Sequence, residues 1–169
     1  LYSAVSDDFI THKENNASRT KVEGWVIELC SDAEFNFITY SECFVSENLL
    51  RKYILDKNIT IDTTRANKVS TQRTQHNQAK NRANISFDIR EDDHDLTYLS
   101  MDDLSALVES DASLAGQNDQ ASLYRDAKEY KPIRDAMAHT ARLTRIAKSR
   151  LNITYENIKA RIITLLKQA

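Results

Sequence analysis

The chain has few of the residues that make tight turns, since only two glycines and one proline occur among its 169 residues. β-Sandwiches, β-barrels and glycine-rich nucleotide loops depend on tight turns and positive φ angles, so this composition argues against them. No apolar run reaches the roughly 18 residues that a membrane-spanning helix needs. Apolar residues make up 41% of the chain and charged residues 28%, which is typical of a folded protein. We therefore predict an all-α fold of helices joined by polar connections.

Cysteine is equally scarce, because Cys30 and Cys43 are the only two. Two cysteines cannot form a disulfide framework or a zinc site by themselves. Both lie among apolar residues at helical spacing, so we expect two buried free thiols. Such cysteine usage is typical of the cytoplasm, where we place the protein. No basic and then apolar leader follows Leu1. We interpret residues 1–169 as a single domain of a longer protein that contains further domains or subunits.

The net charge of −2 conceals an uneven distribution along the chain. Residues 1–119 hold 12 basic and 21 acidic side chains, whereas residues 120–169 hold 11 basic and four acidic ones. A segment as basic as the second one either binds a polyanion or balances the acidic part within the fold. Charge alone leaves both interpretations open.

An apolar stripe predicts a long helical region from about residue 22 to residue 57. Its members are separated by three or four residues: Val22, Val26, Leu29, Ala33, Phe37, Tyr40 and Phe44. We expect this region to be the most buried of the domain, with Trp25, Tyr40 and Phe44 in the core. Ser31 opens a capping-box pattern, so one long helix and two helices that meet near Ser31 are both possible. Residues 1–12 are weakly helical in pattern.

The middle of the chain, over about 58–99, is predicted to be a polar and acidic surface insertion in the helical bundle. Its first part is rich in Asn, Gln, Thr and Arg and predicts a polar helix over 66–83. Residues 85–89 alternate between apolar and polar, which fits a short strand or an extended tether. Acidic residues and His94 are concentrated in 88–95, and we interpret them as a solvated loop rather than a metal site because calcium-loop spacing is absent.

The remaining pattern predicts four more helices. One begins near Ser100 and a second covers about 118–130. Proline is tolerated in the first turn of a helix, so we expect Pro132 to begin a third helix, which runs to about Leu151. A last amphipathic helix covers 155–168.

The predicted helix over 131–151 has one apolar face and one charged face at 100° per residue. The charged face carries Lys131, Arg134, Asp135, His139, Arg142, Arg145 and Lys148. Histidine can exchange a proton near neutral pH, and arginine offers fixed donors to phosphate oxygens. Asp135 precedes His139 by four residues, so its carboxylate is expected to accept a hydrogen bond from the imidazole. These residue types suit phosphodiester cleavage of RNA, because the 2′-OH supplies the nucleophile without a metal.

This segment resembles the R-[N/D/H]-x-x-x-H signature of HEPN domains. The matching residues are Arg134-Asp135-Ala136-Met137-Ala138-His139. The resemblance implies a HEPN-like helical bundle and a metal-independent endoribonuclease, without cofactor, in which two copies of the motif face one another across a homodimer cleft. It implies that Arg134 stabilises the scissile phosphate, that His139 is the general acid or base, and that Asp135 orients them. Such domains are effectors of anti-phage defence and toxin systems, and we expect this function here.

Four basic side chains on the same face are predicted to bind RNA: Lys131, Arg142, Arg145 and Lys148. The toxin branch of the family has a tyrosine two residues after the histidine, and this chain has Ala141 there. The alternative function is a catalytically silent HEPN-like module for nucleotide binding, oligomerisation or partner docking. In that case Asp135 and His139 form an ordinary helix pair, and Arg134 pairs with a carboxylate of the acidic part. Tyr124 and Tyr130 are expected to pack on a neighbouring helix rather than to stack on a base.

Overall fold

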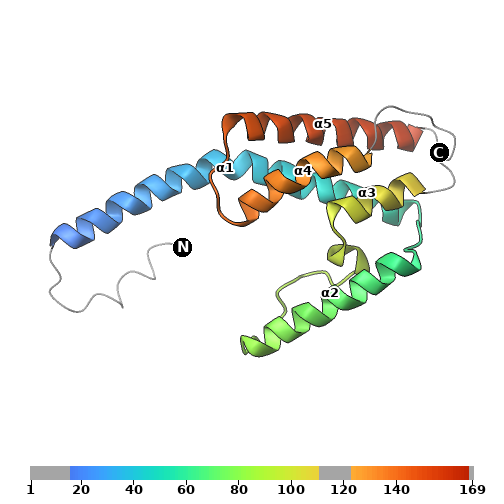
Figure 1. The fold of residues 1–169 in the computed structure, drawn as a ribbon, viewed down its shortest axis with the longest axis horizontal. Helices are drawn as coiled ribbons and strands as arrows, with labels where there is room; N and C mark the ends of the chain where they lie inside the picture. Colours follow the sequence, from blue (N-terminus) through green and yellow to red (C-terminus); the bar gives the residue numbers. More distant parts are fainter. Residues whose placement is uncertain (1–15, 111–122, 168–169) are drawn as a thin grey trace.

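The computed structural model describes residues 16–110 and 123–167. This part of the chain contains five α-helices, one short 3₁₀ helix and no β-strand (Figure 1). The elements in chain order are α1 (Asn16–Asp56), α2 (Thr63–Arg82), η1 (Asp95–Tyr98), α3 (Met101–Ser110), α4 (Leu123–Ala138) and α5 (Arg145–Lys167). The predicted all-α fold is confirmed, whereas the helical pattern over 1–12 lies outside the described residues.

Four helices share one apolar core. The second half of α1 packs against α5 and α3, and α4 packs against α3 and α5 (Figure 1). The fully buried apolar side chains of this core are Leu50, Ile54, Leu104, Leu107, Val108, Leu123, Ala127, Tyr130, Leu151, Ile158 and Leu165. Burial of each large one contributes about 1.5–3 kcal/mol, so these helices form the stable body of the molecule.

α1 is one unbroken helix of 41 residues, so a break near Ser31 is wrong. Its first half projects beyond the other helices (Figure 1), and its apolar side chains there are exposed. The prediction that this region is the most buried of the domain is therefore wrong. Trp25, Tyr40 and Phe44 are 53%, 59% and 60% exposed and do not belong to the core. Periodicity reveals that a helix has an apolar face, but it does not reveal whether the rest of the same chain covers that face.

The two cysteines of α1 differ in their surroundings. Cys43 lies on the side of α1 that packs against the bundle and is buried, whereas Cys30 precedes the bundle and is exposed. The expectation of a buried thiol is therefore correct for Cys43 and wrong for Cys30.

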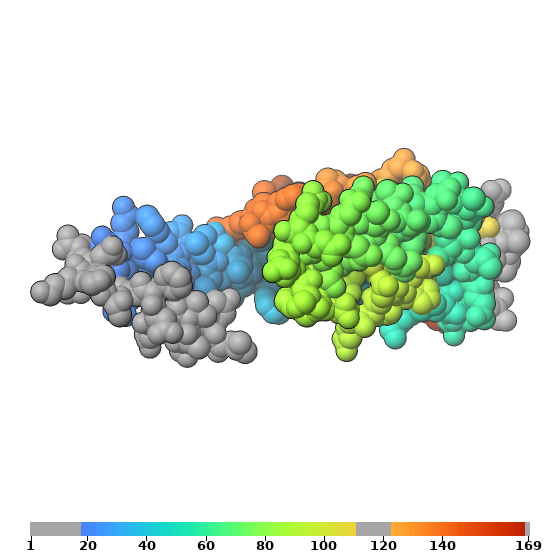
Figure 2. Space-filling model, turned by 90° about the horizontal axis from the view of Figure 1, so that it is seen from below, coloured from blue at the N-terminus to red at the C-terminus, as the bar shows by residue number. Residues whose placement is uncertain are grey.

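α2 lies apart from the four-helix body and forms much of the near face in Figure 2, beside the projecting half of α1. The Asp62 side chain caps its first turn by accepting a 2.9 Å hydrogen bond from the backbone N–H of Arg65. Val69 is its one buried residue. Residues 83–94 return along α2 without forming a strand, so the tether alternative for 85–89 is the correct one.

Two helices, α4 and α5, replace the three that the sequence pattern predicts over about 118–130, Pro132–Leu151 and 155–168. Pro132 lies inside α4 rather than at a helix start. Lys128 and Pro132 are both exposed, so water can bond to the carbonyl that proline leaves without a helical donor. α4 ends at Ala138, and a loop separates it from α5.

A Schellman turn ends α4. The backbone N–H of Ala141 donates to the carbonyl of Ala136 at 3.0 Å, and that of Thr140 donates to Met137 at 2.9 Å. Thr140 has a φ of 62°, a left-handed conformation that is unfavourable for a β-branched residue. The usual glycine signal is missing at this position, which is why the sequence pattern did not predict the end of α4.

Candidate functional site

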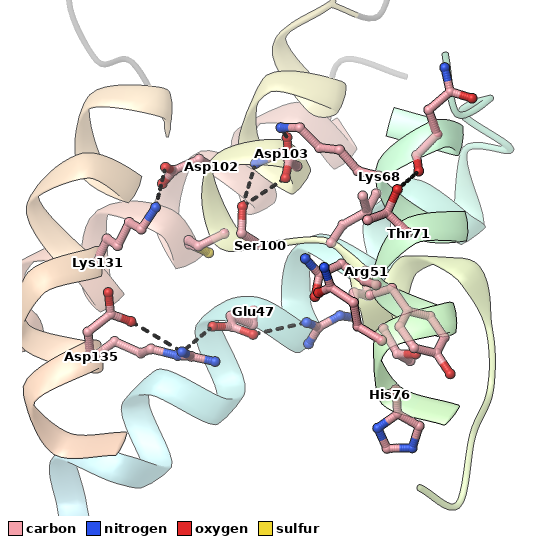
Figure 3. Close-up of a pocket in the computed structure, with 18 of the residues that line it drawn as sticks. Glu47, Arg51, Lys68, Thr71, His76, Ser100, Asp102, Asp103, Lys131 and Asp135 are labelled. Atoms are coloured by element: carbon pink, nitrogen blue, oxygen red, sulfur yellow. Dashed lines mark hydrogen bonds and ion pairs between the residues drawn. The ribbon is translucent and has the colours of Figure 1, made fainter. Parts of the chain in front are cut away.

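An open cleft of about 1020 Å³ separates α2 and η1 from the surface formed by α1 and α4 (Figure 3). The start of α3 closes one end of it. Its charged lining residues are Glu47, Arg51, Lys68, Arg90, Asp102, Asp103, Lys131, Arg134 and Asp135. Cations therefore outnumber carboxylates by five to four in the lining.

Glu47 organises the charges on the α1 side of the cleft. Its Oε2 atom lies 2.9 Å from Nη2 of Arg51, and both side chains are only about 15% exposed. Its Oε1 atom lies 3.6 Å from Nε of Arg134 and 3.1 Å from the hydroxyl of Tyr130. The same hydroxyl is 3.1 Å from the carbonyl oxygen of Cys43. One carboxylate thus joins α1 to α4 at the floor of the cleft.

The protonation states of these groups follow from their burial and neighbours. Burial raises the pKa of Tyr130, and the negative charge of Glu47 raises it further, so the phenol stays neutral. Burial also raises the pKa of Cys43 to about 11, which makes this thiol a poor nucleophile. For Arg134, burial acts to lower the pKa, but Glu47 and Asp135 outweigh it and the pKa rises above its usual value. Arg134 is therefore a permanent cation.

The α3 end of the cleft carries a second set of ion pairs (Figure 3). Asp103 lies 2.5 Å from Nζ of Lys68, and it accepts a 2.9 Å hydrogen bond from the hydroxyl of Ser100. Burial acts to raise the pKa of Asp103, but these two partners outweigh it and the pKa is lowered. Asp102 lies 3.6 Å from Nζ of Lys131, which reaches across from α4.

The α2 wall is polar and uncharged over most of its length. Its lining side chains recur at helical spacing and carry amide, hydroxyl and imidazole groups: Thr64, Asn67, Thr71, Gln72, Gln75 and His76. Such groups can both donate and accept hydrogen bonds, as the edges of nucleobases do. Tyr98 also lines the cleft, and the centre of its ring lies 4.9 Å from the guanidinium carbon of Arg73 and 4.7 Å from that of Arg90.

A second groove, of about 490 Å³, lies between α1 and the last turn of α4 and adjoins the cleft. Tyr40 and Phe44 line its α1 side, and Met137 and Ala138 line its α4 side. Arg134 lines both hollows, so it lies where the cleft and the groove meet.

His139 caps the C-terminal end of α4, directly after Ala138 of the groove. Its backbone N–H donates to the carbonyl of Asp135 at 3.0 Å. Its side chain is exposed and makes no hydrogen bond within 16–110 or 123–167. The predicted bond between Asp135 and His139 is therefore not formed, because the Asp135 carboxylate instead lies 3.2 Å from Nη1 of Arg134.

The predicted cationic face does not exist as one surface, since α4 ends before its last members. Lys131, Arg134 and Asp135 line the cleft. Arg142 instead lies 3.1 Å from Asp32 of α1. Lys148 donates to the carbonyl of Phe35 and lies 3.8 Å from the centre of its ring. Part of the basic segment therefore balances acidic and aromatic groups of α1 within the fold.

Two other predicted residues lie away from the site. Arg145 begins α5 with an exposed side chain. Tyr124 is 39% exposed beside Nζ of Lys128, whereas Tyr130 packs in the core as expected.

Sequence reasoning missed Glu47, Arg51 and the α2 wall. Glu47 and Arg51 have the spacing of a helical ion pair, and this signal was available in the sequence. Their position beside Arg134 was not, because Glu47 and Arg134 are far apart in the chain.

The acidic segment 88–95 forms ion pairs with α2. Arg73 lies 2.8 Å from Asp95 and 3.6 Å from Asp93, and Lys80 lies 3.1 Å from Asp88. Among the residues that the structure describes, no three His, Cys, Asp or Glu side chains come together as a metal site.

No protein-family model, curated protein sequence or solved structure matches this chain. None of the described helices combines the length and the apolar composition that crossing a membrane requires.

Proposed function

We propose that this chain is a HEPN-like, metal-independent endoribonuclease domain whose substrate strand lies in the cleft. The observation that carries the proposal is the position of Arg134, a permanent cation that lines both the cleft and the groove, which is also lined by Ala138, the residue before His139. Lys131, Arg51 and Lys68 line the same cleft, where each pairs with a carboxylate, and the lining as a whole keeps an excess of one positive charge for phosphates.

The proposed reaction is a transesterification. The RNA 2′-OH loses its proton and attacks the neighbouring phosphorus, a new 2′-O–P bond forms, and the P–O5′ bond breaks. One product carries a cyclic phosphate, and the departing 5′-oxygen takes up a proton to become a hydroxyl. His139 takes or gives a proton in this exchange, and its exposed imidazole has no competing hydrogen bond among the described residues. Arg134 stabilises the extra negative charge on the phosphorane. Its Nη1 atom is bonded to Asp135, so other donors of its guanidinium remain for a phosphate oxygen.

A second function is supported by the charge around Arg134. Glu47 and Asp135 already neutralise this side chain, and Asp135 does not bond to His139. This arrangement fits a catalytically silent HEPN-like module that binds nucleotides, oligomerises or docks a partner. The role of the domain as an effector of anti-phage defence or of a toxin system belongs to the first function only.

An RNA cleavage assay in EDTA separates the two functions. The full chain is compared with His139→Ala and Arg134→Ala, and Arg145→Ala serves as the matched loss of an arginine outside the cleft. We expect cleavage by the wild type and by Arg145→Ala, and a loss of at least about a hundredfold in the other two. Circular dichroism shows whether each variant folds.

Two results would overturn the nuclease. Absence of cleavage by the folded wild-type chain would favour the silent module. Equal cleavage by wild type and His139→Ala would show that the activity does not come from this site.

A further inference from the structure

The first three quarters of α1 expose an apolar stripe that no described part of the chain covers. The α1 stripe consists of Val22, Val26, Leu29, Phe37, Tyr40 and Phe44, with Ala33 at its centre. Each of the six large side chains is between 51% and 69% exposed. At 100° per residue they fall within an arc of about 80°, so they form one continuous face of the helix.

The α1 stripe is not the face that packs against the bundle. Thr39, Cys43, Ser46 and Leu50 are the buried residues of that other face. It lies roughly 110° around the helix from the α1 stripe. The four-helix body therefore cannot cover the stripe, even where α1 runs alongside it.

The exposed area is large for a single molecule. At about 150–250 Å² for each aromatic side chain, and less for each valine and leucine, the stripe exposes roughly 600 Å². Contiguous apolar patches on monomers rarely exceed about 300–600 Å², and a stable interface buries about 800 Å² on each partner. One stripe thus has nearly the area that one side of such an interface requires.

The spacing of the stripe residues indicates which kind of molecule covers the stripe. Counted from Ala33, stripe residues lie four, seven and eleven positions away in both directions along the chain. Two antiparallel copies of α1 centred on Ala33 would therefore place an apolar side chain opposite every apolar side chain. The facing pairs are Val22 with Phe44, Val26 with Tyr40, Leu29 with Phe37, and Ala33 with its counterpart.

These pairs also match in size. Each layer outside the centre combines one aliphatic side chain from one copy with one aromatic side chain from the other, so the layers have similar volumes. Ala33 lets the two backbones approach at the crossing point. In a parallel pair Phe37 would instead face Phe37 and Val26 would face Val26. The aromatic layers would then be overpacked and the valine layers underpacked.

We propose that a second copy of this chain covers the α1 stripe, as an antiparallel α1–α1 dimer with its twofold axis at Ala33. A homodimer is also what the HEPN resemblance implies, but its surface, antiparallel orientation and register are argued from the α1 stripe alone and do not depend on RNA cleavage.

The same register also places Trp25 at the interface between the two copies. Trp25 lies at the edge of the stripe, on the side of the helix where the bundle packs further along the chain. Antiparallel pairing brings it level with residue 41 of the second copy. There Tyr40, Phe44 and Met137 line the groove that begins at Arg134. In this register, Trp25 of each copy lies beside the groove of the other, so the second copy adds an aromatic side chain to the rim of that groove.

Analytical ultracentrifugation of the full 169-residue chain tests the interface. We expect a concentration-dependent dimer for the wild type and a dissociation constant raised more than about a hundredfold by Val26→Glu, which buries two unpaired charges. Ile27→Glu is the matched control, because Ile27 is 72% exposed on another side of the same helix. It should leave the dimer intact. Circular dichroism confirms that both variants remain helical.

Disulfide crosslinking tests the orientation, in a Cys30→Ser background. Antiparallel pairing predicts that Val26→Cys and Tyr40→Cys chains crosslink when mixed, and that neither crosslinks alone. Crosslinking of Val26→Cys with itself would show a parallel pair and overturn the register. A monomer at every concentration, or a dimer that Val26→Glu leaves unchanged, would overturn the interface itself.

Discussion

Replacing Glu47 with alanine removes the carboxylate that joins α1 to α4 at the floor of the cleft. The pair with Arg51 is the largest loss, because both side chains are about 15% exposed and lie 2.9 Å apart. Losing one partner of such a pair costs about 1–2 kcal/mol. The contact with Arg134 adds at most about 0.5 kcal/mol, because it is 3.6 Å long and Arg134 is half exposed.

Tyr130 loses less than a full hydrogen bond in this variant, because its hydroxyl can still donate to the carbonyl of Cys43. We allow about 0.5 kcal/mol for it, so the free energy of unfolding should fall by about 1.5–3 kcal/mol in total. For a domain of this size, that corresponds to a Tm lower by roughly 3–12 °C.

Urea denaturation of both chains, followed by circular dichroism, measures this loss. Glu156→Ala is the control, because Glu156 forms an exposed pair with Lys159 on the surface of α5 and should cost less than about 0.5 kcal/mol. If Glu47→Ala costs no more than Glu156→Ala, the charge network at the floor of the cleft does not stabilise the fold and the reasoning is refuted.

Three further outcomes follow from single residues. Thr140→Gly should raise the free energy of unfolding by up to about 1 kcal/mol in urea titrations, since glycine accepts the left-handed backbone at the end of α4; a destabilised variant would contradict this. The lowered pKa of Asp103 means that its stabilisation is fully present above its unfolded pKa of about 3.9 and is lost as the pH falls through its folded value. Asp103→Asn should therefore lose less stability than wild type between pH 7 and about pH 3, and equal losses would count against the role of Asp103. A thiol reagent at pH 8 should titrate the exposed Cys30 rapidly and the buried Cys43, with its pKa of about 11, only after unfolding; two fast thiols would show that Cys43 is accessible.

The helices were predictable from the sequence where the chain uses ordinary signals. Low glycine and proline content indicated an all-α fold, and the polar pattern over 66–83 predicted α2 nearly to its ends, Thr63 and Arg82. The end of α4 was not predictable, because Thr140 adopts a conformation that normally requires glycine or asparagine. This one missed helix end leads to a second error. A helix that continues past Ala138 would place Arg142 and Lys148 on one face with Arg134, and the structure has no such face.

The site was predictable only in part, because its contacts are long-range. Lys131, Arg134 and Asp135 are close in sequence and line one cleft, as expected of neighbours on one helix. Glu47 lines the same cleft from another helix, and no local sequence pattern predicts its contact with Arg134. For the α1 stripe, the helical spacing of the apolar residues was evident from the sequence. What covers them was not, because this spacing is the same whether the apolar face packs on its own core or on another molecule.

α2 is attached to the rest of the molecule mainly by charge. Val69 is its one buried residue, and its other links are polar, such as Lys68 with Asp103 and Arg73 with Asp95. Exposed ion pairs are weakened by salt, whereas the apolar packing of the four-helix body is not. The amide hydrogens of α2 should therefore exchange with solvent well before those of α5, and faster still as ionic strength rises. We therefore expect the α2 wall of the cleft to be more compliant than the opposite wall, and the width of the cleft to change with salt and with any ligand that bridges the two walls.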